Sequence, residues 1–434
     1  MDNILKGKKL LVLGGAQLSC EIIKKAQELG VYVVVTDYNE IEDSPGKRIA
    51  DQSFMVSTTD VDAVVKLIEE ENIDGVIVGF VDMLLPYYAE ICRRTGLPSY
   101  GTKEQFDIFI NKDKYKALCR KFHVPTVDEY AVDLENFEES TSEIKYPVLV
   151  KPADSSGARG ITICYSKEEL REAYQKASQF SSSGKILVER YLLGKEATVF
   201  WLFDDGKYYL TALGNRHMKN SQEGVIPLPV GYTFPSNILS KYQKDIEENV
   251  KQMLSFVGIK NGMMFMQCKI ENDECIVYDI GYRLTGSLEY KILQKVCGYD
   301  PLEMMIRFAL TGKMCEQDVA NKINPHFNRY GFNLSFLAKP GKIKKILGMK
   351  ELLEIPQVID AVIAHDAGEE ITEEMKGLLA QITLRVLGTA DNLESLKNLI
   401  ELIEKHVNIL SDQDENLLLP GLEFEDILKD IEIL

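Results

Sequence analysis

The sequence predicts a mixed α/β and α+β protein: a doubly wound, parallel α/β domain at the N-terminus and two α+β regions after it. Residues 9–100 alternate short apolar segments with amphipathic helices, which is typical of a parallel sheet covered on both faces. Later apolar segments are joined by tight turns, which favours antiparallel sheets. The 434 residues allow about three domains at about 150 residues each. We expect these at residues 1–110, 111–320 and 321–434.

The N-terminal elements follow from this alternation. An apolar run ends in the turn Gly14-Gly15-Ala16, and a β-branched run leads to Asp37. In order, we expect strand Lys9–Leu13, helix Leu18–Leu29, strand Val31–Val35, helix Val61–Glu70 and strand Gly75–Val78.

The middle region opens with the helix Lys112–Phe122, which stops before a Val-Pro pair because proline ends a helical pattern. A small α+β unit of about residues 125–196 follows, and then a largely antiparallel sheet. The unit contains strand Val148–Lys151, strand Ile161–Tyr165, helix Lys167–Gln179 and strand Ile186–Glu189. The sheet contains strands Thr198–Phe203, Tyr208–Ala212, Met263–Ile270 and Cys275–Ile280.

The C-terminal region combines short strands with two helices, and no internal repeat is visible in the chain. Alternation of apolar residues marks the strands, and a wider apolar spacing marks the helices. The expected elements are strands Phe332–Leu337, Lys342–Leu347 and Val358–His365, and helices Leu393–Lys405 and Phe424–Ile433.

Composition excludes several classes of function. Fifty Lys and Arg against 67 Asp and Glu give a net charge of −17, which argues against general nucleic-acid binding. No apolar run approaches the length of a membrane span, and the first residues show no signal-peptide pattern. The eight cysteines form no C-x-x-C pair, so neither a zinc site nor a disulfide framework is expected. A cytoplasmic protein without membrane or nucleic-acid partners fits best.

A glycine turn follows the first expected strand. After Gly14, Ala16 and Ser19 replace two glycines of the dinucleotide-binding G-x-G-x-x-G turn. Asp37 ends the second strand, where that motif has its acidic residue. NAD binding is the weaker interpretation because of the missing glycines. The stronger one is a tight turn at Gly15 that lies near a substrate.

A lysine at a strand end precedes a loop of small residues. Lys151 ends the strand, and residues 155–160 read Ser-Ser-Gly-Ala-Arg-Gly. The backbone N–H groups of such a loop can approach phosphate oxygens, while the lysine supplies a point charge. The alternative is a β-hairpin with a flexible tip and an exposed lysine.

Two acidic residues flank the linker after the next strand. The backbone after Glu189 could pair with an adenine edge, and Glu196 could bind ribose hydroxyls. The alternative is a turn that happens to lie between two charged residues.

A hairpin carries Gln267 on its first strand and Asp279, Gly281 and Arg283 on its second. Since side chains alternate along a strand, the last three share a face, and Gln267 could lie beside Asp279. An amide oxygen and a carboxylate suit Mg²⁺, which keeps few protein ligands. The alternative is an Asp–Arg ion pair on a sheet face.

These four clusters, in this order, resemble the ATP-grasp superfamily of ATP-dependent carboxylate ligases, which includes L-amino-acid ligases and carbamoyl phosphate synthase. The resemblance covers about residues 8–320, and the remainder is similar in outline to the C-terminal region of amino-acid ligases. It implies an ATP-grasp domain of two α+β subdomains, in which residues 125–196 form the small lid subdomain. It also implies ATP and Mg²⁺ as cofactors, with Mn²⁺ as an alternative, and suggests a homodimer.

The resemblance also implies a role for each matching residue. Lys112, Lys151 and the loop residues Ser155, Ser156, Gly157 and Gly160 would contact ATP phosphates. Glu189 and the backbone of Tyr191 would meet adenine, and Glu196 would bind ribose. Gln267 and Asp279 would hold the metal, and Arg283 would steady the acyl phosphate. We expect Arg216, His217 and Gly15 on the substrate side, with Arg216 as a carboxylate clamp.

Two positions depart from the family pattern. The first metal position, often Glu, is Gln267, as it also is in carbamoyl phosphate synthase-like members. Gly281 stands where the family usually has Asn, which removes one expected ligand of a second metal ion.

The implied activity is that of a ligase. A small carboxylate, expected to be an amino acid, attacks the γ-phosphoryl group of ATP to give an acyl phosphate and ADP, and an amine then displaces phosphate. Two alternatives stay open. A catalytically weak ATP-binding regulator would explain Gly281, whereas an NAD-dependent dehydrogenase would use Gly14 and Asp37 but leave Lys151 unexplained.

Overall fold

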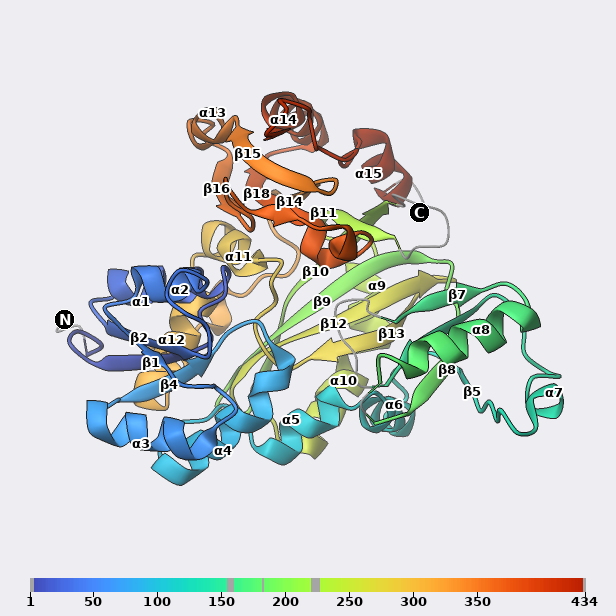
Figure 1. The fold of residues 1–434 in the computed structure, drawn as a ribbon, viewed down its shortest axis with the longest axis horizontal. Helices are drawn as coiled ribbons and strands as arrows, with labels where there is room; N and C mark the ends of the chain where they lie inside the picture. Colours follow the sequence, from blue (N-terminus) through green and yellow to red (C-terminus); the bar gives the residue numbers. More distant parts are fainter. Residues whose placement is uncertain (1–3, 154–159, 182, 220–226, 432–434) are drawn as a thin grey trace.

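A computed structural model describes residues 4–153, 160–181, 183–219 and 227–431. Three groups of strands and helices surround a long central sheet (Figure 1). The N-terminal parallel sheet lies on one side of it, and the small sheet with its covering helix lies on the other. The C-terminal helices lie above. Within the described residues, no helix combines the length and apolar character that a membrane crossing requires.

The N-terminal sheet is parallel throughout, in the order β3-β2-β1-β4. Residues 10–13 of the central strand are buried because helices cover both faces, which explains their continuous apolar run. The strands are β1 (Lys9–Leu13), β2 (Tyr32–Asp37), β3 (Gln52–Met55) and β4 (Gly75–Val78). The helices are α1 (Ser19–Glu28), α2 (Pro45–Ile49), α3 (Val61–Glu71), α4 (Leu85–Thr95) and α5 (Lys103–Ile110). The doubly wound parallel α/β domain is confirmed.

Asn111 separates α5 from the next helix, α6 (Lys112–Lys121). Its side-chain oxygen accepts hydrogen bonds from the N–H groups of Asp113 (3.1 Å) and Lys114 (3.2 Å), which satisfies the first turn of α6. Because residues four apart lie on one helix face, Lys112 and Lys116 project to the same side.

A four-stranded antiparallel sheet in the order β5-β8-β6-β7 follows. It contains β5 (Glu129–Tyr130), β6 (Val148–Pro152), β7 (Thr162–Cys164) and β8 (Ile186–Arg190). α7 (Phe137–Ser140) lies beside it, and α8 (Lys167–Ser178) covers one face with Leu170 and Ala173. Leu149 pairs with Glu189, so Lys151 and Glu189 share the uncovered face.

The central sheet has eight antiparallel strands in the order β13-β12-β9-β10-β11-β14-β18-β16. They are β9 (Lys195–Asp204), β10 (Lys207–Lys219), β11 (Leu228–Phe234), β12 (Gly262–Glu271), β13 (Glu274–Gly281), β14 (Tyr330–Leu337), β16 (Val358–Ile363) and β18 (Ile382–Ala390). β11 pairs with β14 from Gly231↔Leu334 to Phe234↔Gly331. One sheet therefore runs through both the middle and the C-terminal regions (Figure 1).

The remaining elements close the core around this sheet. α9 (Leu239–Asp245), α10 (Glu247–Val257), α11 (Glu289–Cys297) and α12 (Pro301–Thr311) belong to the middle region. The C-terminal region also has a three-stranded sheet of β17 (Glu370–Ile371), β15 (Gly341–Leu347) and β19 (Asn408–Ser411). Its helices are α13 (Met349–Leu353), α14 (Leu393–His406) and α15 (Phe424–Ile431).

Candidate active site

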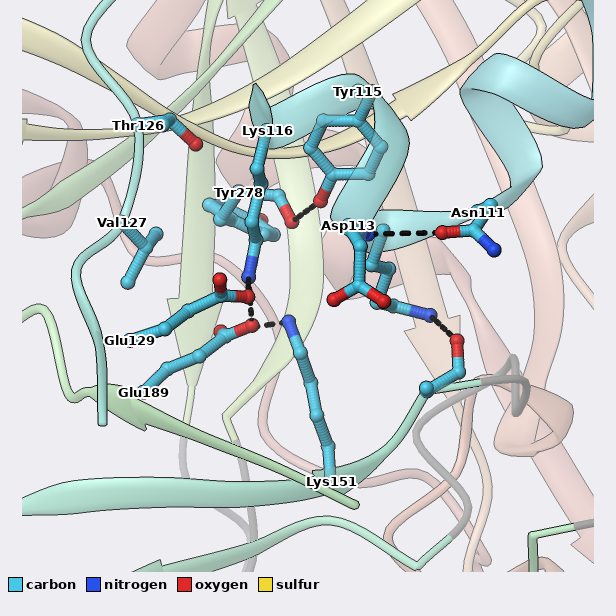
Figure 2. Close-up of polar contacts among 12 residues, drawn as sticks. Asn111, Asp113, Tyr115, Lys116, Thr126, Val127, Glu129, Lys151, Glu189 and Tyr278 are labelled. Carbon is cyan, nitrogen blue, oxygen red and sulfur yellow. Dashed lines mark hydrogen bonds and ion pairs between the residues drawn. The ribbon is translucent and has the colours of Figure 1, made fainter. Parts of the chain in front are cut away.

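Lys116 and Lys151 meet Glu129 and Glu189 between α6 and the small sheet (Figure 2). Lys151 Nζ lies 2.7 Å from one oxygen of Glu189, and Lys116 pairs with the other. Lys116 also lies 2.6 Å from Glu129 Oε1. Lys112 donates to the backbone oxygen of Ala153 (3.3 Å), immediately before the loop of small residues. The predicted phosphate-contacting lysines therefore lie at one place.

Burial and charge act in opposite directions in this cluster. Burial lowers the pKa of Lys151, and the nearby Lys116 and Lys112 add to this effect, although Glu189 opposes it. Burial pushes the pKa of Glu189 up, but Lys151 and Lys116 outweigh it and hold that pKa below its usual range. Glu189 is thus ionised, and its charge is shared by two cations.

The predicted phosphate loop is described only at its end. Ser155, Ser156 and Gly157 lie outside the described residues. Gly160 has a φ of +71°, and a Cβ there would lie 3.0 Å from both Phe180 and Pro152. Glycine suits this position for both reasons.

The predicted metal ligands are direct neighbours across β12 and β13, where Gln267 pairs with Asp279. The half-buried Asp279 makes no hydrogen bond or ion pair with any described residue. Burial raises its pKa, Asp82 adds to this, and Lys112, Lys151 and Arg283 oppose it. A carboxylate without a partner beside an amide oxygen fits a divalent cation that phosphate oxygens would complete. In the described ranges, no three His, Cys, Asp or Glu side chains gather as cation ligands.

Gly281 lies under an aromatic ring. A Cβ at this position would overlap the ring of Phe265, which pairs with it across the hairpin. The same ring lies 5.0 Å from the guanidinium carbon of Arg283. Phe265 therefore occupies the space into which an asparagine side chain would have to fit.

Arg283 connects the hairpin to the N-terminal domain. Its Nε and Nη2 donate to the two carboxylate oxygens of Asp82, at 2.8 and 2.6 Å, and Nη1 donates to the oxygen of Leu284. Asp82 follows β4, at the carboxyl edge of the parallel sheet, where ligands commonly bind in open α/β folds. Our sequence analysis missed Asp82, although its position after a predicted strand was a usable signal.

Glu196 lies in a second charged cluster on the face of the central sheet. It pairs with Arg216, with Lys269 (2.9 Å) and with the Tyr278 hydroxyl (2.9 Å). Although burial pushes its pKa up, Arg216 and Lys269 hold that pKa below its usual range. The register shift after Gln267 leaves Tyr278 as an extra, unpaired residue in β13. Because of this bulge, the side chains of the neighbours Tyr278 and Asp279 lie on the same face of the sheet.

Arg216 and His217 point to opposite faces because they are neighbours in β10. Arg216 donates to Glu196, Tyr232 and Tyr278, so it is already engaged on the nucleotide side. His217 is buried on the other face and lies 2.8 Å from the Thr233 hydroxyl. The structure therefore does not bring this predicted pair together. The N–H of Tyr191 is likewise engaged, by the oxygen of Pro147 (3.1 Å).

The glycine turn after β1, for which NAD binding was the weaker interpretation, is closed by side chains from β2 and the segment that follows it. Asp37 accepts from the Gly15 N–H (2.9 Å) and the Ser44 hydroxyl (2.7 Å), and its other oxygen pairs with Lys47 (2.9 Å). Asp37 is buried, and both oxygens of its carboxylate already have partners, so it cannot bind the hydroxyl groups of a ribose. The NAD-dependent dehydrogenase alternative therefore has no acidic residue for its cofactor at this position.

The polar face of the central sheet continues into the C-terminal region. Glu196, Arg216, Tyr232 and Asn333 follow one another directly across β9, β10, β11 and β14. Two residues further along, Ser335 pairs with Arg385 of β18 and accepts from its guanidinium (2.7 Å). No carboxylate of the described chain lies within 4.0 Å of Arg385. This cation was not expected from the sequence.

Comparison with known proteins gives a family match to the middle of the chain and similar sequences over most of it. Residues 111–317 match the family described as carbamoyl-phosphate synthase L chain, ATP binding domain. The 2-oxoglutarate carboxylase small subunit of Hydrogenobacter thermophilus is 24% identical over 399 residues, 86% of this chain and 82% of that protein. The carbamoyl phosphate synthase large chain of Clostridium beijerinckii is 25% identical over 328 residues, 72% of this chain but only 30% of that protein.

Solved structures share the fold across nearly the whole chain. The L-amino acid ligase from Bacillus licheniformis has a TM-score of 0.76 at 18% identity, over 94% of this chain and 99% of that one. The biotin carboxylase domain of H. thermophilus 2-oxoglutarate carboxylase, in complex with MgADP, ADP and bicarbonate, has a TM-score of 0.74 at 21% identity. It covers 93% of this chain and 90% of that one. Residues 111–317 thus match an ATP-grasp ATP-binding domain, and the chain as a whole shares the fold of ATP-dependent ligases.

Proposed function

We propose that this protein activates a small carboxylate with ATP as an acyl phosphate and couples it to an amine. The observation that carries this proposal is geometric: Lys112 contacts Ala153 just after Lys151, and Gln267 lies beside Asp279 on the hairpin that leads to Arg283. Two lysines on the phosphate side and one arginine on the acyl side are what phosphoryl transfer to a carboxylate needs, because the reaction depends on positioning and charge.

The residues divide into three roles. Lys112 and Lys151 bind the triphosphate, with the loop that ends at Gly160. Gln267 and Asp279 would hold Mg²⁺, which would supply Lewis-acid charge stabilisation. Glu196 lies on the nucleoside side, as does the backbone at Tyr191, and Glu189 holds Lys151 in place.

Arg283 positions the carboxylate and stabilises the acyl phosphate. The carboxylate oxygen forms a bond to the γ-phosphorus as the bond to ADP breaks. The amine nitrogen then forms a bond to the acyl carbon, phosphate leaves, and the amine loses a proton. The Asp82 carboxylate fixes the guanidinium plane by a two-point contact, so Arg283 enters this reaction already oriented.

Substrate binds over the polar sheet face and below the turn at Gly15. Arg385 has no carboxylate partner among the described residues, which makes it a better candidate than Arg216 for an anionic substrate group. Asn333 lies two residues from Ser335, and its side-chain oxygen has no partner among the described residues. An α-amino acid, with a carboxylate for Arg385 and an ammonium group for Asn333, suits this pair.

Phosphate release from ATP tests the proposal. Amino acids and small carboxylates would be supplied singly and in pairs, with Mg²⁺ present. Release that needs one carboxylate and rises with one amine is the expected result. Lys151→Ala should abolish it, whereas Lys114→Ala, which removes an exposed lysine of α6, should not. Normal turnover in Lys151→Ala would contradict the assignment of Lys151 to the ATP phosphates.

A second candidate is a catalytically weak ATP-binding regulator, which the Phe265 ring over Gly281 favours. ATP binding without phosphate release across the whole panel would support it. We also propose a cytoplasmic location, which suits eight free cysteines, and a homodimer. Light scattering of the purified protein tests the assembly.

A further inference from the structure

Two glutamates face each other directly on the small sheet. Glu129 of β5 pairs with Glu189 of β8, so their carboxylates lie on the same face at neighbouring positions. Like charges in directly opposed positions destabilise a sheet unless a cation lies between them. Lys116 of α6 supplies that cation and contacts both carboxylates (Figure 2). Its side chain is 0% exposed.

Glu189 is shared by two lysines with different surroundings. One oxygen belongs to Lys116 and the other to Lys151, at 2.7 Å. The Lys116 side chain is buried between its own helix, α6, and strand β8, so it cannot reach an incoming ligand. Lys151 is the last residue but one of β6, shortly before the loop of small residues, and is the lysine that our proposed function assigns to ATP phosphate.

This arrangement sets a condition for phosphate binding. To contact a phosphate, Lys151 must give up part of its contact with Glu189. Glu189 is almost fully buried, and a buried carboxylate left without a cation is strongly unfavourable. Lys116 stays in place and keeps Glu189 paired, so the exchange leaves no uncompensated charge.

We propose that Lys116 is a positioning residue for nucleotide binding: it holds Glu189 while Lys151 moves from Glu189 to the phosphates. The inference rests on the proposed function, because it requires Lys151 to meet phosphate. Lys116 then controls affinity for the phosphate part of the nucleotide and leaves affinity for the nucleoside part unchanged. A residue that only fastened α6 to the small sheet would affect both parts alike.

Calorimetric titration of the full chain with ADP and with adenosine, in Mg²⁺, tests this directly. In Lys116→Met, Glu189 has Lys151 as its remaining contact cation and holds it more tightly. We expect the affinity for ADP to fall at least about tenfold, and the affinity for adenosine to change less than about twofold. Equal losses for both ligands, or no loss for either, would overturn the inference.

Two double variants separate exchange from a simple change in local charge. Lys116→Met with Glu189→Gln and Lys116→Met with Glu129→Gln restore the same net charge, but only the first removes the carboxylate that holds Lys151. The ratio of ADP to adenosine affinity should recover in the first and stay low in the second. Equal recovery in both would refute the exchange. The double variants also serve if Lys116→Met alone fails to fold, as thermal unfolding would show.

The two proposals fail in different ways. A wild-type protein that binds neither ATP nor ADP contradicts the proposed function. A wild-type protein that binds ADP, beside a Lys116→Met variant with an unchanged ratio of affinities, contradicts the role of Lys116 alone.

Discussion

Arg283 and Asp82 form a two-point ion pair between the central sheet and the N-terminal domain, although 201 residues separate them in the chain. The pair is partly buried, and Phe265 packs against the same guanidinium. Because two parallel hydrogen bonds fix a guanidinium in its plane, the N-terminal domain sets the orientation of the arginine that we assign to the acyl phosphate.

Asp82→Asn should therefore reduce turnover without preventing nucleotide binding. Without the Asp82 charge, Arg283 keeps only its contacts with the Leu284 oxygen and the Phe265 ring, so its guanidinium is held less firmly. A small displacement of a group that positions the substrate lowers the reaction rate strongly. We expect kcat to fall about 10- to 100-fold with a nearly constant KM for ATP. Steady-state phosphate release measures both. Asp62→Asn, which breaks the exposed pair with Arg94, is the matched control.

Restoring the family's asparagine should destabilise this protein. In Gly281→Asn the new side chain overlaps the Phe265 ring, and overpacking of this kind costs about 1–3 kcal/mol of unfolding free energy. Urea unfolding measures the loss. Adding Phe265→Leu should recover most of it by making room. If Gly281→Asn is as stable as the wild type, the ring does not fill this space in solution.

Stability should depend on pH through Glu289, a buried carboxyl group in α11. Burial raises its pKa to about 8 from an ordinary 4.5, while its own N–H, Ser287, Arg283 and Arg385 oppose the rise. The folded protein thus keeps a proton that the unfolded chain loses above pH 4.5. The free energy of unfolding should fall by about 1 kcal/mol per pH unit between pH 4.5 and 8 from this group.

Glu289→Gln should remove that part of the slope. Urea unfolding at pH 6 and pH 8 compares the two proteins, and the variant should gain on the wild type at the higher pH. The exposed Glu172→Gln serves as the control. Parallel stability profiles for Glu289→Gln and the wild type would show that the carboxyl group does not hold its proton.

Arg385→Met should weaken substrate binding selectively. A charge-assisted contact to a carboxylate is worth about 1.5–3 kcal/mol, so we expect the KM of the acid substrate to rise at least about tenfold with an unchanged KM for ATP. Arg385→Lys should recover part of the loss. Arg329→Met, which removes an exposed arginine paired with Asp391, is the control. A KM that rises for ATP instead would place Arg385 outside the substrate site.

Local patterns predicted most elements of the fold. The strands Lys9–Leu13 and Gly75–Val78 are found at the expected residues, because they are continuous apolar runs bounded by turns. β10 extends to Lys219, well beyond the expected Ala212, since Gly214–Lys219 alternates less clearly in hydrophobicity. Pairing of β11 with β14 connects segments about 100 residues apart, and no local pattern reports such a partner.

For the site residues as well, local relationships could be predicted from the sequence and long-range ones could not. Gln267 and Asp279 were expected side by side because hairpin register is local. Lys116 lies one turn after Lys112 on the same face, a spacing that we could have used. The extra residue Tyr278 and the separation of Arg216 from His217 depend on strand registers that were not visible in the sequence.

The pairing of β11 with β14 has a consequence for dividing the protein. A chain ended near residue 320 would leave the main-chain N–H and C=O groups of β11 without the partners that Gly331 to Leu334 provide. Such an open, apolar edge recruits strands from other molecules. A fragment with every proposed nucleotide ligand would therefore self-associate rather than remain a monomeric ATP-binding module, and the C-terminal region acts as a cap that keeps the nucleotide-binding half from polymerising.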